Sequence, residues 1–228
     1  MNDTVDIERY LSKNDPALGC AIKLVRTAKG EPVRPPPPND NVFQALVRAV
    51  IYQRSSEASG STVYSRLEEI AGRKVAPAKL LSLTRDRIQK AGMSAAKATY
   101  ILNLARWFDA NPKIAKKLPS MPDQEIISSL TSISGIGLWT VNVLLVFNLG
   151  RLDVAPAPDA VIRGIARIVY GLKRQPSVQF IKERMEAWRP YRSIATMYLY
   201  QAGKMRLTPA DIRRGRAGVD DGGLRSGT

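Results

Sequence analysis

Apolar residues recur along most of this chain at intervals of three and four, which is the period of an amphipathic helix. Val42, Leu46 and Val50 fall on one line of such a helix, and Asp123 can cap another. Further helices are predicted over residues 61–72, 78–83, 85–91, 97–109, 138–149, 160–170, 177–187 and 191–203. No segment shows the alternation typical of a strand. The pattern predicts an all-α protein of about ten helices.

The two ends of the chain differ from this helical middle. Residues 7–27 fit a pair of short helices divided at Asp15-Pro16, and the proline run at 35–38 predicts a stiff extended connector. We expect residues 1–40 to pack on a helical core that spans 41–207. Residues 208–228 are rich in Arg, Gly and Asp and have little to bury, so we expect a basic, mobile tail there.

Charge and composition narrow the class of protein. The 228 residues carry 35 Lys and Arg against 20 Asp and Glu, a formal net charge of +15. This balance favours a polyanionic partner such as nucleic acid, although a merely basic surface is the alternative. There is no His and only one Cys, which excludes a Ser-His-Asp triad, thiolate zinc sites and iron–sulfur clusters. The first residues do not resemble a secretory signal, and no apolar run is long enough for a membrane span, so no membrane association is expected.

The most specific segment is residues 130–141. A helix ends, Gly135 and Gly137 flank one apolar residue, and a new helix begins. Glycines permit a positive φ and a close approach of the backbone to another chain. The first N–H groups of the new helix form an anion site suited to a DNA phosphate. An ordinary tight turn between helices is the alternative.

This hairpin and its surroundings resemble the helix-hairpin-helix DNA glycosylase superfamily, in particular 3-methyladenine DNA glycosylases of the second type in their compact form. The resemblance covers roughly residues 42 to 205. It includes residues 47–53, similar to the helix before the DNA-probing loop, and residues 91–98, similar to the turn before the next helix. Residues 188–193 are similar to a signature near the end of that family. The resemblance implies a two-lobed helical bundle with the active site in the cleft between the lobes.

The resemblance places the catalytic carboxylate at Asp159, which follows the hairpin on the Gly/Pro-rich loop 151–160. Such a carboxylate stabilises the positive charge that develops on deoxyribose as the base departs. The structural alternative is that Asp159 only caps the helix that starts at Ala160, and the two roles are compatible. Asp153 competes for the role, but it matches a non-catalytic position of the family.

Further residues take implied roles from the same resemblance. Trp139 and Tyr200 match positions that line the base pocket, and Trp188 is expected to be packing. Gln53 is counted with the substrate pocket, as a candidate contact to the DNA or to the partner of the lesion. The expected DNA contacts are Arg54, Gly135, Gly137, Trp139, Thr140 and Arg163. Arg54 departs from the family, which commonly has an apolar wedge or Gln at that position. The family's bifunctional members carry a Lys nucleophile where this chain has Trp139, so only hydrolysis is expected.

The resemblance also implies a site for Na⁺ or K⁺ at the backbone carbonyls of Thr131, Ile133 and Gly135. No cofactor is required. The expected function is a monofunctional DNA glycosylase of base excision repair that flips alkylated purines such as 3-methyladenine out of double-stranded DNA and leaves an abasic site. The alternatives are a non-catalytic damage-binding protein, or a glycosylase for hypoxanthine or uracil. A monomer is expected, cytoplasmic and nucleoid-associated if bacterial, and nuclear if eukaryotic.

Overall fold

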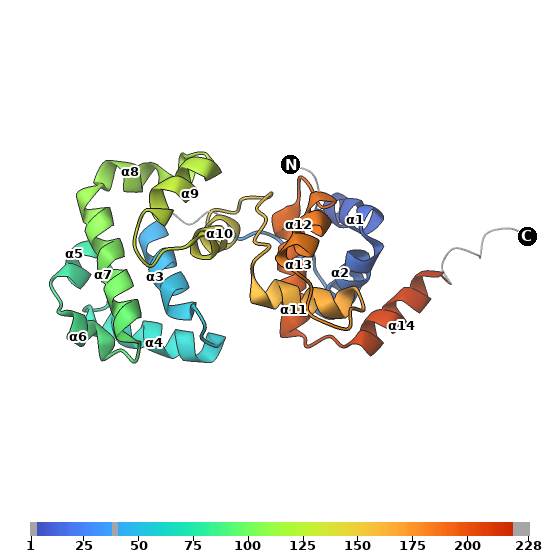
Figure 1. Cartoon of the computed structure of the whole chain (residues 1–228), viewed down its shortest axis with the longest axis horizontal. Helices are drawn as coiled ribbons and strands as arrows, with labels where there is room; N and C mark the ends of the chain where they lie inside the picture. Colours follow the sequence, from blue (N-terminus) through green and yellow to red (C-terminus); the bar gives the residue numbers. More distant parts are fainter. Residues whose placement is uncertain (1–3, 38–40, 221–228) are drawn as a thin grey trace, which may run out of the picture. The chain divides into compact units, whose positions relative to one another are not determined.

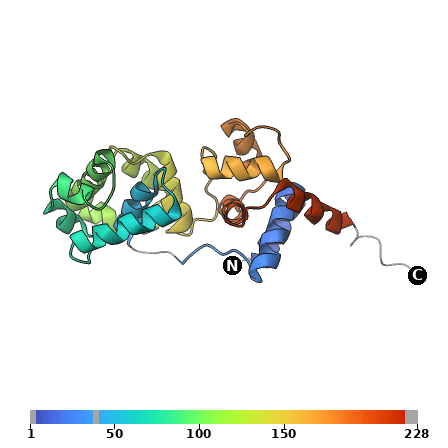
Figure 2. The same cartoon turned by 90° about the horizontal axis from the view of Figure 1, so that it is seen from below.

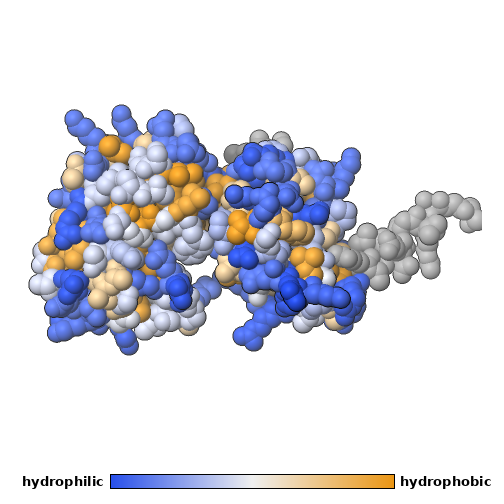
Figure 3. All heavy atoms as spheres, in the orientation of Figure 1, coloured by the Kyte–Doolittle hydropathy of each residue, from blue (hydrophilic) through white to orange (hydrophobic). Residues whose placement is uncertain are grey.

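A computed structural model describes residues 4–37 and 41–220, with side chains described to residue 215. Within this part of the chain every regular element is a helix and no strand occurs, as the periodicity predicts. The helices form two compact units, one made of residues up to 35 together with those from 151 onward, the other of residues 36–150 (Figure 1). We call them unit 1 and unit 2. Hydrophilic residues cover most of the visible face of each unit (Figure 3).

Unit 1 joins the two ends of the sequence. Its helices are α1 (Thr4–Asn14), α2 (Pro16–Lys29), α11 (Ala160–Val169), α12 (Val178–Glu186), α13 (Arg192–Lys204) and α14 (Pro209–Asp220). Helix α13 packs against α2 and α11 and buries every residue from Ser193 to Leu199. The N-terminal helices therefore complete the core that carries the loop before α11.

A buried carboxylate joins three elements of unit 1. Asp15 is 5 % exposed and caps α2 by accepting the Leu18 N–H at 3.0 Å. Its other oxygen accepts hydrogen bonds from the Tyr170 hydroxyl and, at 2.9 Å, from Nε1 of Trp188. A buried carboxylate needs such donors to offset its lost hydration. Trp188 is fully buried here, which confirms its interpretation as a packing residue.

Unit 2 is built around the long helix α7. Its elements are α3 (Val42–Tyr52), α4 (Glu57–Ile70), α5 (Pro77–Leu81), α6 (Arg85–Gln89), α7 (Ala95–Ala110), α8 (Pro112–Lys117), the 3-10 helix η1 (Leu118–Ser120), α9 (Asp123–Thr131) and α10 (Leu138–Phe147). Helix α7 packs against α3, α5 and α6, while α10 packs against α3 and α9. Helix α3 therefore lies between the core of the unit and the second helix of the hairpin.

The structure differs from the sequence expectations at several helix ends. Asp123 does not cap α9: Pro122 holds the cap position, and Asp123 is the first helical residue. Its charge can still favour the N-terminal end of the helix dipole. The short elements α8 and η1 were not predicted, because six and three residues are too few to show a period.

The C-terminal segment also differs from the mobile tail that the sequence predicts. Helix α14 starts at Pro209, packs against α2 and α11, and buries Ile212 (Figure 2). Thr208 and Asp211 form a reciprocal capping box, with the Asp211 carboxylate accepting the Thr208 N–H at 2.8 Å and the Thr208 hydroxyl accepting the Asp211 N–H at 3.3 Å. This pattern is readable in the sequence and outweighs the polar composition. The expected tail beyond residue 220 lies outside the described residues.

Candidate active site

The Asp159 carboxylate caps the first turn of α11. Its Oδ1 accepts the backbone N–H groups of Val161 at 2.7 Å and Ile162 at 3.0 Å, and the residue is only 3 % exposed. These amides lie at the positive end of the helix dipole, so they stabilise a negative charge at this position. The hydrogen bonds that make Asp159 the cap of α11 therefore also fix its carboxylate as a buried negative charge.

Tyr200 completes the environment of this carboxylate. Its hydroxyl donates a hydrogen bond of 2.5 Å to Oδ2 of Asp159, so both carboxylate oxygens have donors. Burial raises the pKa of Tyr200 well above its ordinary value, and the charge of Asp159 and the hydrogen bond to it act in the same direction. The hydroxyl consequently stays protonated and remains a donor at neutral pH.

Helix α13 fixes the loop that leads to Asp159. The Ser193 backbone N–H donates to the Leu152 carbonyl at 3.0 Å, and the Ser193 hydroxyl accepts the Val154 N–H at 3.0 Å. Ser193 is fully buried and lies seven residues, or about two helical turns, before Tyr200. One face of α13 thus holds both the loop and the carboxylate at its end.

Asp153 is engaged in ion pairs. Arg192 donates from Nε and from one terminal nitrogen to its carboxylate, at 2.7 and 2.9 Å, and also donates to its backbone carbonyl at 2.7 Å. Arg189 approaches the same carboxylate at 3.3 Å. This bidentate geometry is that of a structural clamp on the loop. It leaves Asp159 as the better candidate for chemistry.

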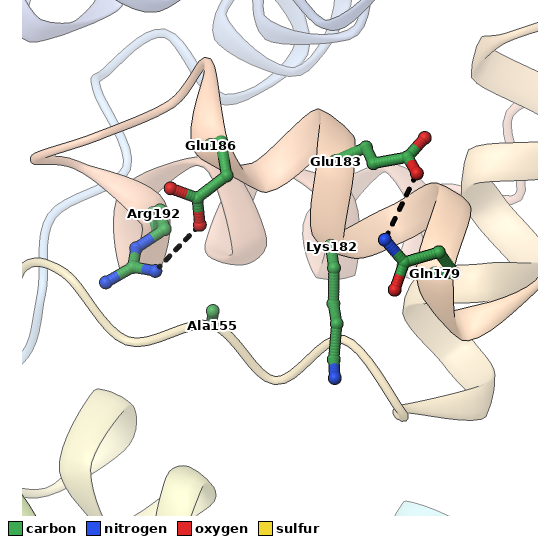
Figure 4. A pocket seen from close by; sticks show the side chains of 6 residues that line it. All are labelled: Ala155, Gln179, Lys182, Glu183, Glu186 and Arg192. Atoms are coloured by element: carbon green, nitrogen blue, oxygen red, sulfur yellow. Dashed lines mark hydrogen bonds and ion pairs between the residues drawn. The ribbon is translucent and has the colours of Figure 1, made fainter.

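A groove of about 300 Å³ lies beside this clamp in unit 1 (Figure 4). It is lined by Ala155, Gln179, Lys182, Glu183, Glu186 and Arg192. Glu186 pairs with Arg192 across it, and the hydrogen bond from Arg189 lowers the pKa of Glu186. Glu183 accepts a hydrogen bond from Nε2 of Gln179 at 3.1 Å, so the lining is mostly polar or charged and the groove is a polar margin of the loop rather than a base pocket.

The hairpin between α9 and α10 belongs to unit 2. Gly135 has φ +94°, and a Cβ added there would lie 2.1 Å from Cγ of Tyr100. The turn therefore requires glycine both for its backbone conformation and for the packed ring. Gly137 is different: it is exposed, has φ −94°, and a Cβ there would meet nothing within 4 Å. The cap position of α10 is Gly137 itself, which has no side chain to accept the first N–H groups of the helix.

Gln53 ties the end of α3 to this hairpin. Its Nε2 donates to the Thr140 hydroxyl at 3.0 Å and to the Gly135 carbonyl at 3.3 Å. The Thr140 side chain is thereby turned inward and is 1 % exposed. The expected DNA contact of Thr140 therefore stays a prediction, since the residue is buried against Gln53. The following residue, Arg54, is exposed and has φ +55°.

A comparison with protein families decides the class of this chain. The model described as HhH-GPD superfamily base excision DNA repair protein matches residues 47–190, which include the hairpin, Gln53, Arg54 and Asp159. The chain belongs to the HhH-GPD superfamily.

Relatives within the HhH-GPD superfamily are similar over most of their length. The alkylbase DNA glycosidase-like protein mag2 of Schizosaccharomyces pombe is 26 % identical over 207 residues, 87 % of this chain and 93 % of the relative. DNA-3-methyladenine glycosylase 1 of the same yeast is 29 % identical over 171 residues, 72 % of this chain and 73 % of the relative.

Solved structures of HhH-GPD proteins share the fold. The S. pombe 3-methyladenine DNA glycosylase Mag1 in complex with abasic DNA matches with a TM-score of 0.73 at 27 % identity, over 86 % of this chain and 95 % of that one. A DNA-3-methyladenine glycosidase from Bacillus halodurans matches with a TM-score of 0.70 at 28 % identity, over 89 % of each chain.

The structure groups the predicted residues of this HhH-GPD protein by unit. Asp159 and Tyr200 are in direct contact in unit 1, where Arg163 is half-buried and donates from Nε to the Pro176 carbonyl at 2.9 Å. Unit 2 holds Gln53, Arg54, Gly135, Gly137, Trp139 and Thr140. Trp139 is half-buried in the first turn of α10. The expectation of a cleft between two lobes stays a prediction.

Sequence reasoning missed the residues that hold these groups in place. From the sequence, Asp15 is interpreted only as the break between two helices, and Lys97 only as part of a turn and the first residue of a predicted helix. Both act through partners that are distant in sequence: Asp15 accepts from Trp188 across 173 residues, and Lys97 donates to Ile51 across 46. The Asp-Pro sequence does signal a cap, but no local pattern identifies such partners.

Side chains of the described residues form no group of three or more His, Cys, Asp or Glu that could hold a metal ion. A cation site at the hairpin would therefore depend on backbone carbonyls. Of the three expected ligands, the Ile133 carbonyl accepts the Ile136 N–H at 3.0 Å and the Gly135 carbonyl accepts Gln53. A carbonyl oxygen has two lone pairs, so these bonds are compatible with a bound cation.

Proposed function

We propose that this HhH-GPD protein is a monofunctional DNA glycosylase that hydrolyses the bond between an alkylated purine and its deoxyribose. The candidate substrates are 3-methyladenine and 7-methylguanine in double-stranded DNA. The observation that carries the proposal is the buried Asp159 carboxylate, which is held by two backbone amides and the Tyr200 hydroxyl. The names of the relatives described above support the same class of substrate.

Hydrolysis of the bond between base and sugar mainly requires a fixed negative charge near C1′ of the deoxyribose. As the C1′–N bond breaks, its electron pair leaves with the base, and positive charge develops on C1′ and the ring oxygen of the sugar. A preorganised carboxylate stabilises that charge without having to reorganise. Water then adds its oxygen to C1′ and releases a proton. An alkylated purine such as 3-methyladenine is already cationic and leaves as a neutral base, so a chain without His has the groups it needs.

Hydrolysis without strand cleavage follows from the residue at the start of α10. A glycosylase that also cuts the strand needs an amine nucleophile to form a Schiff base with the sugar. The second residue after Gly137 is Trp139, whose indole cannot form one. We therefore propose that the product is an intact strand with an abasic site.

Binding to DNA is proposed to use both units. Unit 2 contributes the open backbone at Gly137 and the N-terminal amides of α10, which suit a phosphate, together with the exposed Arg54. Unit 1 contributes Asp159, Tyr200 and Arg163. The Mag1 structure contains abasic DNA, which supports a DNA partner for this relative of it. We propose damaged double-stranded DNA as that partner and a monomer as the active form.

Two secondary proposals accompany this function. We propose Na⁺ or K⁺ at the carbonyls of Thr131, Ile133 and Gly135, where the cation would supply positive charge for a phosphate. Compartment follows from the substrate: cytoplasmic and nucleoid-associated in a bacterium, nuclear in a eukaryote. Among the described residues no helix is long and apolar enough to cross a membrane.

The test is base release from methylated duplex DNA, measured with and without a later alkali step. We expect free 3-methyladenine to appear, with strand breaks only after alkali. Tight binding of the same DNA without release would overturn the catalytic role and favour a damage-binding protein. Release of hypoxanthine or uracil instead, from duplexes that contain those bases, would overturn the substrate class alone.

A further inference from the structure

The loop between α3 and α4 holds Arg54 in an unusual backbone conformation. Arg54 is exposed and has φ +55°, in the left-handed region that residues with a Cβ rarely adopt. Such a conformation persists only where the surroundings determine it, and it clusters at functional sites. The question is which neighbours fix the loop.

Gln53 fixes the first side of the loop. Its backbone N–H ends α3 by donating to the Ala49 carbonyl at 3.1 Å, while its side chain donates to Thr140 and Gly135 of the hairpin. The backbone immediately before Arg54 is therefore joined to α10. The backbone of Arg54 therefore has a fixed position relative to the hairpin of the same unit.

Lys97, from the first turn of α7, fixes the other side. Its Nζ donates to the Ile51 carbonyl at 2.6 Å and to the Ser55 hydroxyl at 3.0 Å. The first bond satisfies a carbonyl at the C-terminal end of α3, where a positive charge is favourable. The second reaches past Arg54 to the next residue. Partial burial lowers the pKa of Lys97 from its ordinary value.

Lys97 and Gln53 therefore hold Arg54 between two anchors from different helices. An arginine guanidinium is planar and can stack on bases where a nucleotide has left the duplex. Holding its backbone beforehand removes part of the ordering cost of that insertion.

We propose that Lys97 is a positioning residue that fixes the Arg54 loop for insertion into duplex DNA at a missing or flipped nucleotide. This inference rests on the proposed function, since it assumes that the loop meets damaged DNA. Lys97 itself need not touch the DNA. Its effect on binding is transmitted through the backbone from Ile51 to Ser55, which it joins to α7.

The test is a double-mutant cycle with Lys97→Met and Arg54→Ala. The readout is the ratio of affinities for a duplex with a tetrahydrofuran abasic analogue and for the undamaged duplex. We expect each single variant to lose roughly tenfold in this ratio, and the double variant to lose no more than Arg54→Ala alone. Independent, multiplying losses would overturn the proposal, because Lys97 would then act other than through Arg54.

Matched variants separate positioning from general stability. Lys97→Arg keeps a charged donor and should restore most of the ratio. Lys113→Met removes an exposed lysine from α8 and should leave the ratio unchanged. If Lys97→Met does not fold, Ser55→Ala removes one of the two anchoring bonds and should show the same coupling to Arg54. No coupling for a folded Ser55→Ala and no loss for a folded Lys97→Met would each overturn the proposal.

Base release by the wild-type protein distinguishes a failure of this proposal from a failure of the proposed function. Release of methylated bases by the wild type, combined with independent losses in the cycle, would overturn the role of Lys97 alone. Absence of release together with an intact coupling would overturn the glycosylase activity and leave the Lys97–Arg54 relationship standing.

Discussion

The Tyr200 hydroxyl and the Asp159 carboxylate form a 2.5 Å hydrogen bond, in which the tyrosine is the donor. Burial and the neighbouring charge of Asp159 raise the pKa of Tyr200. In the unfolded chain the hydroxyl has its ordinary pKa of 10.0. Because the folded pKa is higher, the stability that this tyrosine contributes is present below pH 10 and decreases as the pH rises above it.

Replacement of Tyr200 by Phe should therefore change the alkaline stability profile. Above pH 10 the free energy of unfolding of the wild type should fall more steeply than that of Tyr200→Phe, by up to about 1.4 kcal/mol per pH unit. Urea unfolding at pH 9, 10 and 11 measures the difference. Parallel profiles would contradict a buried, protonated Tyr200. Tyr191→Phe is a useful control, because it removes the hydroxyl of another tyrosine of unit 1, one whose ring packs edge-on against that of Tyr10.

Asp153→Asn should affect stability more than chemistry. The substitution removes the charge that Arg192 holds in a bidentate pair, where the two side chains are 30 % and 12 % exposed. We expect a loss of about 1–3 kcal/mol in the free energy of unfolding. Single-turnover base release should stay within about tenfold of the wild type, since Asp153 is a clamp. A loss as large as that of an Asp159 variant would mean that the two carboxylates have been assigned the wrong way round.

The two hairpin glycines should respond differently to alanine. Gly135→Ala forces a Cβ into the Tyr100 ring and keeps a positive φ, so it should lose roughly 2–4 kcal/mol of stability. Gly137→Ala meets open space and should change stability by less than about 1 kcal/mol. Its Cβ would instead hinder a phosphate, and affinity for duplex DNA should fall. Thermal unfolding and DNA titration separate the two effects; equal stability losses would contradict the described turn.

The sequence predicts this fold well where the determinants are local. Helices with a clear apolar period, the cap at Asp159 and the positive φ of Gly135 all follow from neighbouring residues. Short elements such as α8 were not predicted, and α14 was overlooked although its Thr208–Asp211 capping box is local. Local sequence and burial tendencies compete in such segments, and composition alone misjudges them.

The site is less predictable, because its contacts join distant residues. Tyr200 reaches Asp159 across 41 residues, and Gln53 reaches Thr140 across 87. The resemblance to glycosylases proposed Tyr200 and Thr140 as pocket and DNA residues, whereas the structure gives each side chain a protein partner. Only the packing of α13 beside α11, and of α3 beside α10, brings these pairs together.

We propose that the Asp159 carboxylate stabilises the positive charge that develops on the sugar during base release. Asn retains an oxygen that can cap α11, so Asp159→Asn removes the charge with little change to the fold. The decisive measurement is the single-turnover rate of 3-methyladenine release by this variant, at protein concentrations that saturate the DNA. We expect a loss of about 100-fold or more in this rate, with the affinity for DNA retained. A variant that binds and excises at the wild-type rate would contradict it.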